Sequence, residues 1–138
     1  MDYAKCTIMT TDSIVVVREN RSTFELKNDR RISINKVKVD GCLIDMNSEK
    51  CDWIISISSL NTALFIELKG CDIDKGISQL KSTLQLTNQK FRNYQRKCYV
   101  VTTRIPKHGP TIRRKSLAFH KQTKATLSVK NIRATECC

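Results

Sequence analysis

Residues 52–69 read DWIISISSLNTALFIELK, two apolar runs joined by a short polar link. The first run covers residues 52–57 and the second covers residues 63–69. Both runs are short and are bounded by polar or turn-forming residues, which is typical of β-strands buried in a sheet. A link as short as residues 59–61 allows the two strands to pair as neighbours.

Charged residues stand at the ends of these two predicted strands. Successive side chains of a strand point to opposite faces, so Glu67 and Lys69 share one face. If the strands pair, Asp52 comes to lie beside them. Two carboxylates and an ammonium group then meet at the edge of a buried sheet, where charges are costly unless they are paired or hold a metal. Two carboxylates on adjacent strands suit a hard divalent cation such as Mg²⁺.

The flanking segments predict an α/β fold. Gly70 ends the second strand, and Asp72 is a candidate helix N-cap. Apolar residues then recur every three to four positions, which predicts a helix over residues 73–87, and Gly76 within it suggests a close backbone contact. Further strands are expected at residues 13–18, 23–27, 32–44 (interrupted at Asp40-Gly41), 97–103 and 125–130, with a second helix at 111–123. Because the later strands alternate with helices, we expect a mixed central β-sheet flanked by helices.

The length and composition indicate a single globular domain. The chain has 138 residues, inside the usual range for one domain, with residues 1–35 expected as an N-terminal strand extension and residues 36–138 as the core. No apolar run is long enough to span a bilayer, and no signal core is present near Met1. From these two features we expect a cytoplasmic protein with mostly reduced thiols. The seven cysteines include no Cys-x-x-Cys pair and there are only two histidines, so we expect no structural zinc site.

The charge is strongly asymmetric along the chain. The net charge is +12, and residues 81–138 carry 14 of the 25 Lys and Arg but only one of the 13 acids. The C-terminal part therefore has a charge of +13 and the first 80 residues a charge of −1. Such a field attracts polyanions in a salt-dependent way, which favours nucleic acid as a partner. The alternative is a solvated surface that only confers solubility.

The pattern of Asp52, a 14-residue gap, Glu67-Leu68-Lys69 at the end of an apolar strand and then a helix resembles the PD-(D/E)xK nuclease superfamily. Cys51 stands where that family often has proline, and the resemblance covers roughly residues 36–103. It implies a restriction-endonuclease-like core in which Asp52 and Glu67 bind Mg²⁺, or Mn²⁺ as a substitute. The backbone carbonyl of Leu68 is a further ligand in this reading, and Lys69 orients or activates the attacking water.

Three further positions are candidate catalytic residues. Some branches of the family place a glutamine on the helix after the motif, which corresponds here to Gln79, although the tyrosine that follows in those branches is replaced by Thr83. Many members supply another carboxylate from an N-terminal helix, and this sequence predicts no such helix. Glu25 and Asp40 are the substitutes, and Asp40 is equally a turn residue of a bulge before Gly41.

The basic residues of the C-terminal part are candidate phosphate contacts. Arg104 is the best placed, just beyond the strand at residues 97–103. The other candidates are Arg92, Arg96, Lys107, Arg113, Arg114 and Lys115, with Lys90 and Lys97 also nearby in sequence. Such contacts position a duplex without reading its sequence, and we recognise no reader module such as a helix-turn-helix or zinc finger.

These observations predict a Mg²⁺-dependent nuclease that hydrolyses phosphodiester bonds, with DNA a better candidate substrate than RNA. A hydrolase of this size is expected to form a homodimer or to work as a subunit of a larger assembly. One alternative is a nuclease-fold module that has lost catalysis and only binds nucleic acid. The other is a structural or regulatory subunit whose basic half docks an acidic protein.

Overall fold

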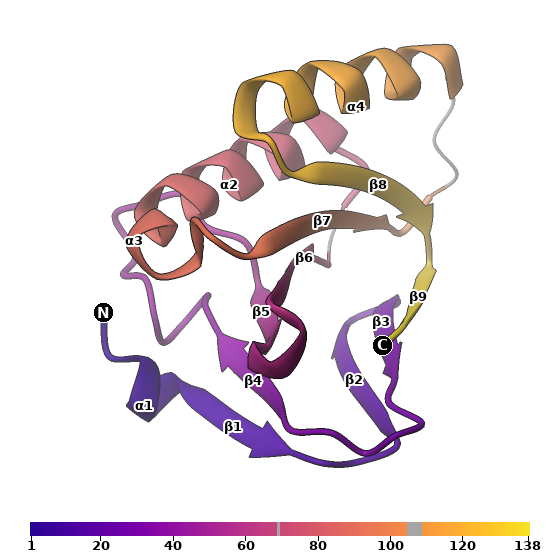
Figure 1. Cartoon of the computed structure of the whole chain (residues 1–138). Coiled ribbons are helices and arrows are strands. Elements are labelled where there is room, and N and C mark those ends of the chain that lie inside the picture. The colour runs from indigo at the N-terminus through magenta and orange to yellow at the C-terminus, as the bar shows by residue number, and fades with distance from the viewer. Residues whose placement is uncertain (69, 105–108) are drawn as a thin grey trace.

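The two apolar runs form adjacent strands at the centre of a six-stranded sheet (Figure 1). The computed structural model describes residues 1–68, 70–104 and 109–138. The strands β4 (Ile34–Lys38), β5 (Trp53–Ile57) and β6 (Thr62–Glu67) form an antiparallel meander. The short strand β1 (Thr7–Thr10) adds to β4 at one edge of the sheet. A 3₁₀ turn, η1 (Ser58–Leu60), and Asn61 in the left-handed region make the β5–β6 link.

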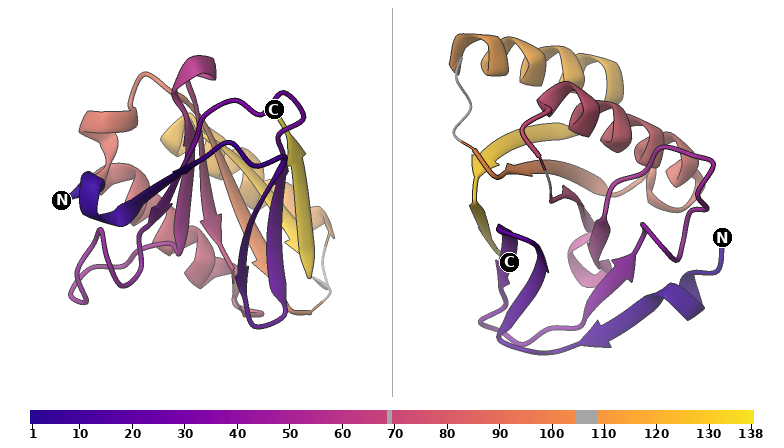
Figure 2. Two further views of the ribbon diagram at one scale, coloured as in Figure 1. Left: turned by 90° about the horizontal axis from the view of Figure 1, so that it is seen from below. Right: turned by 180° about the vertical axis from the view of Figure 1, so that it is seen from behind.

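The other half of this sheet is parallel. The strands β7 (Gln95–Thr102) and β8 (Thr126–Asn131) follow β6 in the order β6-β7-β8. Helix α2 (Ile73–Leu86) and the short α3 (Asn88–Phe91) connect β6 to β7, and α4 (Gly109–Thr123) lies between β7 and β8 in the chain. Both long helices cover the same face of the sheet (Figures 1 and 2). The predicted mixed sheet flanked by helices is therefore confirmed.

A second, three-stranded sheet covers the opposite face of the central sheet. It contains β2 (Ile14–Glu19), β3 (Ser22–Lys27) and β9 (Arg133–Cys137), in the order β2-β3-β9. Strand β9 continues from β8 after a single residue, Ile132, whose φ of 65° lies in the left-handed region. At this corner the chain passes from the central sheet into the second sheet. The second sheet therefore contains strands from both the N-terminal and the C-terminal part of the chain.

The central sheet separates two apolar cores. On the helix side, Phe65 of β6 packs with Leu80 of α2, Phe91 of α3 and Phe119 of α4. On the other side, the alternate residues of β5 and β6 pack against the second sheet. Ile55, Leu64 and Ile66 of the central sheet lie in this core with Phe24 and Leu26 of β3. This alternation is what the wholly apolar runs of β5 and β6 require, because both faces of these strands are buried.

Some elements differ from the sequence prediction. The expected strand at residues 32–44 is limited to β4, because the chain turns at Asp40 and Gly41, where Gly41 has a φ of 86°. An N-terminal helix, which the sequence did not predict, is present as the single turn α1 (Tyr3–Cys6), with Asp2 as its cap. The strands β1 and β9 and helix α3 were also missed, since each is only four or five residues long.

The oxidation state of two cysteines also differs from the sequence prediction. Cys6 of α1 and Cys42 of the turn after β4 form a disulfide, while the remaining five cysteines are free. The expectation of mostly reduced thiols holds for those five only. Among the described residues, no helix is long and apolar enough to cross a membrane.

Candidate functional site

The backbone of Asp52 is bonded to both neighbouring strands just before β5 begins. Its carbonyl oxygen accepts hydrogen bonds from the N–H groups of Val39 (3.0 Å) and Asp40 (3.3 Å). Its own N–H donates to the carbonyl oxygen of Ile66 in β6 (3.0 Å). Two consecutive residues therefore oppose one residue of the partner strand, which is the pattern of a β-bulge. Asp40 is the bulge residue that the sequence offered as one of its two readings.

The carboxylate of Asp52 is also held by β6. Its Oδ2 accepts a hydrogen bond of 2.7 Å from the backbone N–H of Leu68, and the residue is only 4% exposed. The two bonds from Asp52 to this strand end reach Ile66 and Leu68, the residues on either side of Glu67. The predicted proximity of Asp52 and Glu67 is thus built into the hydrogen bonds between their strands.

Glu67 is the last residue of β6 and is 1% exposed. It pairs with Val100 of β7, and its side chain faces helix α2 at Gly76. A Cβ atom on Gly76 would lie 3.3 Å from both methyl groups of Val100 and 3.6 Å from Cγ of Glu67. The glycine therefore allows α2 to pass directly over the buried carboxylate, as its position within the predicted helix suggested.

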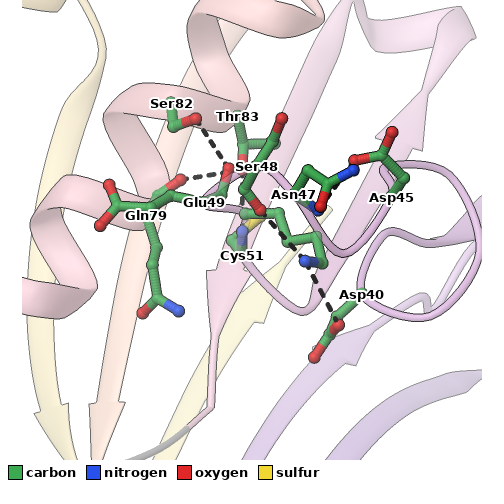
Figure 3. Close-up of polar contacts among 10 residues, drawn as sticks. Asp40, Asp45, Asn47, Ser48, Glu49, Cys51, Gln79, Ser82 and Thr83 are labelled. Atoms are coloured by element: carbon green, nitrogen blue, oxygen red, sulfur yellow. Dashed lines mark hydrogen bonds and ion pairs between the residues drawn. The ribbon is translucent and has the colours of Figure 1, made fainter.

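Thr83 of α2 ties the helix to the residue before Asp52. Its buried hydroxyl accepts a hydrogen bond of 2.8 Å from the N–H of Cys51 and donates one of 2.9 Å to the carbonyl oxygen of Gln79 (Figure 3). Burial raises the pKa of the Cys51 thiol well above its ordinary value, and the carboxylates of Glu67 and Asp52 raise it further. The thiol beside the two carboxylates is therefore neutral at physiological pH.

The loop before Cys51 lies against α2 (Figure 3). The Glu49 carboxylate accepts a hydrogen bond from Ser78 Oγ (2.5 Å), and the Glu49 carbonyl accepts one from Ser82 Oγ (2.7 Å). Lys50 Nζ lies 4.0 Å from the Asp40 carboxylate, whose side chain is 48% exposed. Asp40 therefore supports Asp52 through its backbone, while its carboxylate belongs to a surface ion pair with Lys50.

The other predicted catalytic residues lie in different places. Glu25 is in β3 of the second sheet, on the far side of the central sheet from α2 (Figure 1). Its carboxylate accepts a hydrogen bond of 3.0 Å from Arg133, so the structure does not bring it together with Asp52. Gln79 is half-buried on α2, and Figure 3 shows its side chain extending away from Ser82 and Thr83. Lys69 lies outside the described residues.

Asp52 and Glu67 offer the oxygen donors of a hard-cation site. Within the described ranges, no group of three or more His, Cys, Asp or Glu side chains could hold a metal ion. A pair of carboxylates suits Mg²⁺, because this ion is usually bound by one or two carboxylates and keeps several water ligands. The donor set therefore fits the predicted ion, with the carbonyl of Leu68 remaining a predicted ligand.

The predicted phosphate contacts divide between the two ends of β7. Arg104 is exposed beyond the end of β7, where Thr103 N–H donates to the Gly70 carbonyl (3.2 Å) and Thr102 Oγ1 donates to the Arg104 carbonyl (2.7 Å). The strand ends that carry Glu67 and Arg104 are thereby joined. Arg104 is thus at the same edge of the sheet as the carboxylates.

Arg92 and Arg96 lie at the other end of β7. Arg96 pairs with Ala63, four residues before Glu67, which corresponds to about 13 Å along the strand. Its guanidinium donates to the carbonyl of Thr123 (2.9 Å) and so fastens the end of α4. The structure therefore does not bring these two arginines to the end of the sheet that holds the carboxylates, and their role as phosphate contacts stays a prediction.

Three further basic candidates belong to α4. Arg113 and Arg114 are exposed, and Lys115 is paired with Asp74 of α2. Lys107 lies outside the described residues. Sequence reasoning missed the roles of Val39 and Thr83, for which there was no signal, because their bonds reach residues 13 and 32 positions away.

No protein-family model, curated protein or solved structure matches this chain.

Proposed function

We propose that this chain is a Mg²⁺-dependent nuclease of PD-(D/E)xK type that hydrolyses phosphodiester bonds, with DNA as its substrate. The observation that carries the proposal is that two buried acids, Asp52 and Glu67, lie on neighbouring strand ends of the central sheet, where Asp52 is hydrogen-bonded to the residues on either side of Glu67. Burying two acids next to each other is costly, and binding a divalent cation is a function that offsets this cost. The order of β4, β5, β6, α2 and β7 agrees with the core that the sequence motif predicts.

Each residue of the site has a distinct task in this proposal. Asp52 and Glu67 would hold Mg²⁺, which when bound lowers the pKa of a water ligand and stabilises negative charge on phosphate oxygens. The N–H of Leu68 orients the Asp52 carboxylate. Gly76 lets α2 shield Glu67 from bulk water. Arg104 would bind a phosphate beside the bond to be cut. Lys69 would balance the negative charge of the phosphate at that bond.

The test is cleavage of supercoiled plasmid and linear duplex by the purified protein in Mg²⁺, Mn²⁺ or EDTA. We expect metal-dependent cutting that is lost in Asp52→Asn, Glu67→Gln and Lys69→Ala. The Asn substitution keeps an oxygen that can accept the Leu68 N–H bond, so the loss reports on charge. Nicked circles would identify an endonuclease.

Two carboxylates away from this pair provide the controls. Glu25→Gln and Asp40→Asn remove the other two acids that the sequence suggested, and both should keep full cleavage because their side chains pair with Arg133 and Lys50. Cleavage that persists in Glu67→Gln would refute the proposal. A salt-sensitive mobility shift without any cutting, common to wild type and Glu67→Gln, would instead identify a nuclease-fold module that only binds nucleic acid.

We also propose a cytoplasmic location and assembly as a homodimer or as a subunit of a larger complex. The assembly is supported by the sequence, because the chain has one small catalytic unit and duplex cleavage needs two cuts. The location is supported by the five free cysteines, and the Cys6–Cys42 disulfide is the exception to it. Light scattering of the purified protein with and without duplex, and fractionation of the cells that produce it, would test these two statements separately.

A further inference from the structure

One face of helix α4 is exposed and carries positive charge. Residues 109–123 contain no acid. Phe119 fixes the buried face of the helix. Arg113, Arg114 and Lys121 are spaced by seven or eight residues across the opposite face, and Lys124 follows directly after the helix; all four are exposed. We refer to these four residues as the α4 ridge.

The ridge begins near the candidate site. Lys115 pairs with Asp74 in the first turn of α2, and Lys81 of α2 donates a hydrogen bond to Gln122 of α4. Both contacts join residues 41 positions apart, so the two helices run side by side in the same direction (Figure 1). Asp74 is two residues from Gly76, where an added Cβ atom would lie 3.6 Å from Cγ of Glu67. The ridge therefore starts at the end of the sheet that holds the carboxylates and runs away from it.

The length of the ridge suits a nucleic-acid backbone. At about 1.5 Å per residue, Arg113 and Lys124 are separated by roughly 16 Å along the helix axis. One strand of a duplex places a phosphate about every 3.4 Å of its axis, so the ridge spans about five phosphates. Lys115 is not part of it, because its ammonium is engaged by Asp74.

We propose that the α4 ridge is a binding track for the phosphate backbone of a DNA duplex, on one side of the bond to be cut. This inference rests on the proposed nuclease function and specifies how its substrate is held. An anionic membrane fits less well, because Leu117 (68% exposed) is the one large apolar side chain on the ridge face, and Phe119 is buried. A lone leucine gives little apolar area to insert into a bilayer.

The experiment measures binding of a fluorescent 20-base-pair duplex in EDTA at 50–300 mM NaCl. The test variant is Arg114→Gln/Lys121→Gln, which keeps good helix formers at both positions. The matched control is Arg21→Gln/Lys27→Gln, which removes the same charge from exposed positions around β3, on the far side of the central sheet. We expect the test variant to bind at least tenfold more weakly at 100 mM salt, with a salt slope smaller by about two. The control should keep the wild-type slope.

Equal losses in the two variants would overturn the inference, because the binding would then follow net charge alone. Binding of anionic lipid vesicles or of polyglutamate, with no binding of duplex, would also overturn it. The outcome is separable from that of the proposed function, since EDTA abolishes cutting. Loss of binding confined to the ridge variant, in a protein that never cuts, would support the track and refute the nuclease. If the protein cuts DNA and the ridge variant keeps the wild-type salt slope of binding, the nuclease would be supported and the track refuted.

Discussion

On the helix side, Thr83 of α2 holds Asp52 in position through a hydrogen bond to the preceding residue, Cys51. Its hydroxyl is the acceptor for the N–H of Cys51, and both residues are fully buried. Thr83→Val keeps the shape of the side chain but leaves that N–H without this acceptor, which typically costs about 1–3 kcal/mol. We expect the free energy of unfolding in urea to fall by that amount.

Thr83→Ser is the control, because serine keeps the hydroxyl and loses only a methyl group. It should retain most of the stability that Thr83→Val loses. If the two variants lose equal stability, the methyl packing and not the hydrogen bond would explain the role of Thr83.

Gly76 provides the second prediction at this scale. Any side chain larger than hydrogen must fit between Val100, which is fully buried, and Glu67. We expect Gly76→Val to lower the free energy of unfolding by about 1–3 kcal/mol, the usual cost of overpacking a core. Gln85→Val on the exposed face of the same helix introduces the same side chain without the clash. Helix propensity favours Gly76→Val over Gln85→Val, so a loss in urea unfolding well above that of Gln85→Val reports the clash at Gly76. Equal losses in both variants would contradict the close contact.

At the scale of elements, the corner between β8 and β9 is strained. Ile132 is β-branched and has a φ of 65°, a conformation that costs about 1–2 kcal/mol for such residues. It is retained because its N–H donates to the Thr102 carbonyl (2.7 Å) and its carbonyl accepts from Thr23 N–H (2.9 Å). The strain therefore accompanies the bonds that join the two sheets.

Asparagine adopts this conformation more readily, and Ile132 is 48% exposed, so little burial is lost. We expect Ile132→Asn to be at least as stable as the wild type. Ile14→Asn is the matched control, since Ile14 is 51% exposed in the regular strand β2. It should be at least about 1 kcal/mol less stable than Ile132→Asn by thermal or urea unfolding, and the opposite order would show that Ile132 is unstrained.

The elements that the sequence predicted are those with a strong internal pattern. The wholly apolar runs of β5 and β6 and the Ile73, Ile77, Leu80 and Leu84 stripe of α2 identify these elements to within two residues. In contrast, β9 contains a single buried apolar residue, Ala134, and forms because it extends β8 and pairs with β3. Its stability comes from tertiary contacts that no local pattern reveals.

At the scale of the whole molecule, the same contrast applies to the site. The pairing of β5 with β6 follows from their short link, so the proximity of Asp52 and Glu67 was predictable. The distribution of positive charge was only partly predictable: the strand at residues 97–103 separates Arg96 from Arg104, but the pairing of Lys115 with Asp74 depends on how α4 packs beside α2. Arg104 and Arg96 are eight residues apart in sequence and lie at opposite ends of the sheet.

Two buried thiols in the helix-side core contribute to the pH dependence of stability. Burial raises the pKa of the thiols of Cys51 and Cys98, which are at most 1% exposed. In the unfolded chain these thiols ionise near their ordinary pKa of about 8.5. A group that stays protonated only in the folded state contributes fully below that pH, and its contribution is lost as the pH rises above it.

We therefore expect the free energy of unfolding to be level near pH 7 and to fall above about pH 9, with each thiol adding a slope of about 1.4 kcal/mol per pH unit. Urea unfolding between pH 7 and 10.5 measures this slope. Cys98→Ala should be less stable at pH 7, since it leaves a gap in the core. Its loss of stability with rising pH should be shallower by the contribution of one thiol, about 1.4 kcal/mol per pH unit. Cys137→Ala, at an exposed position, should keep the wild-type slope. An unchanged slope in Cys98→Ala would mean that the buried thiol ionises as easily in the folded protein as in the unfolded chain.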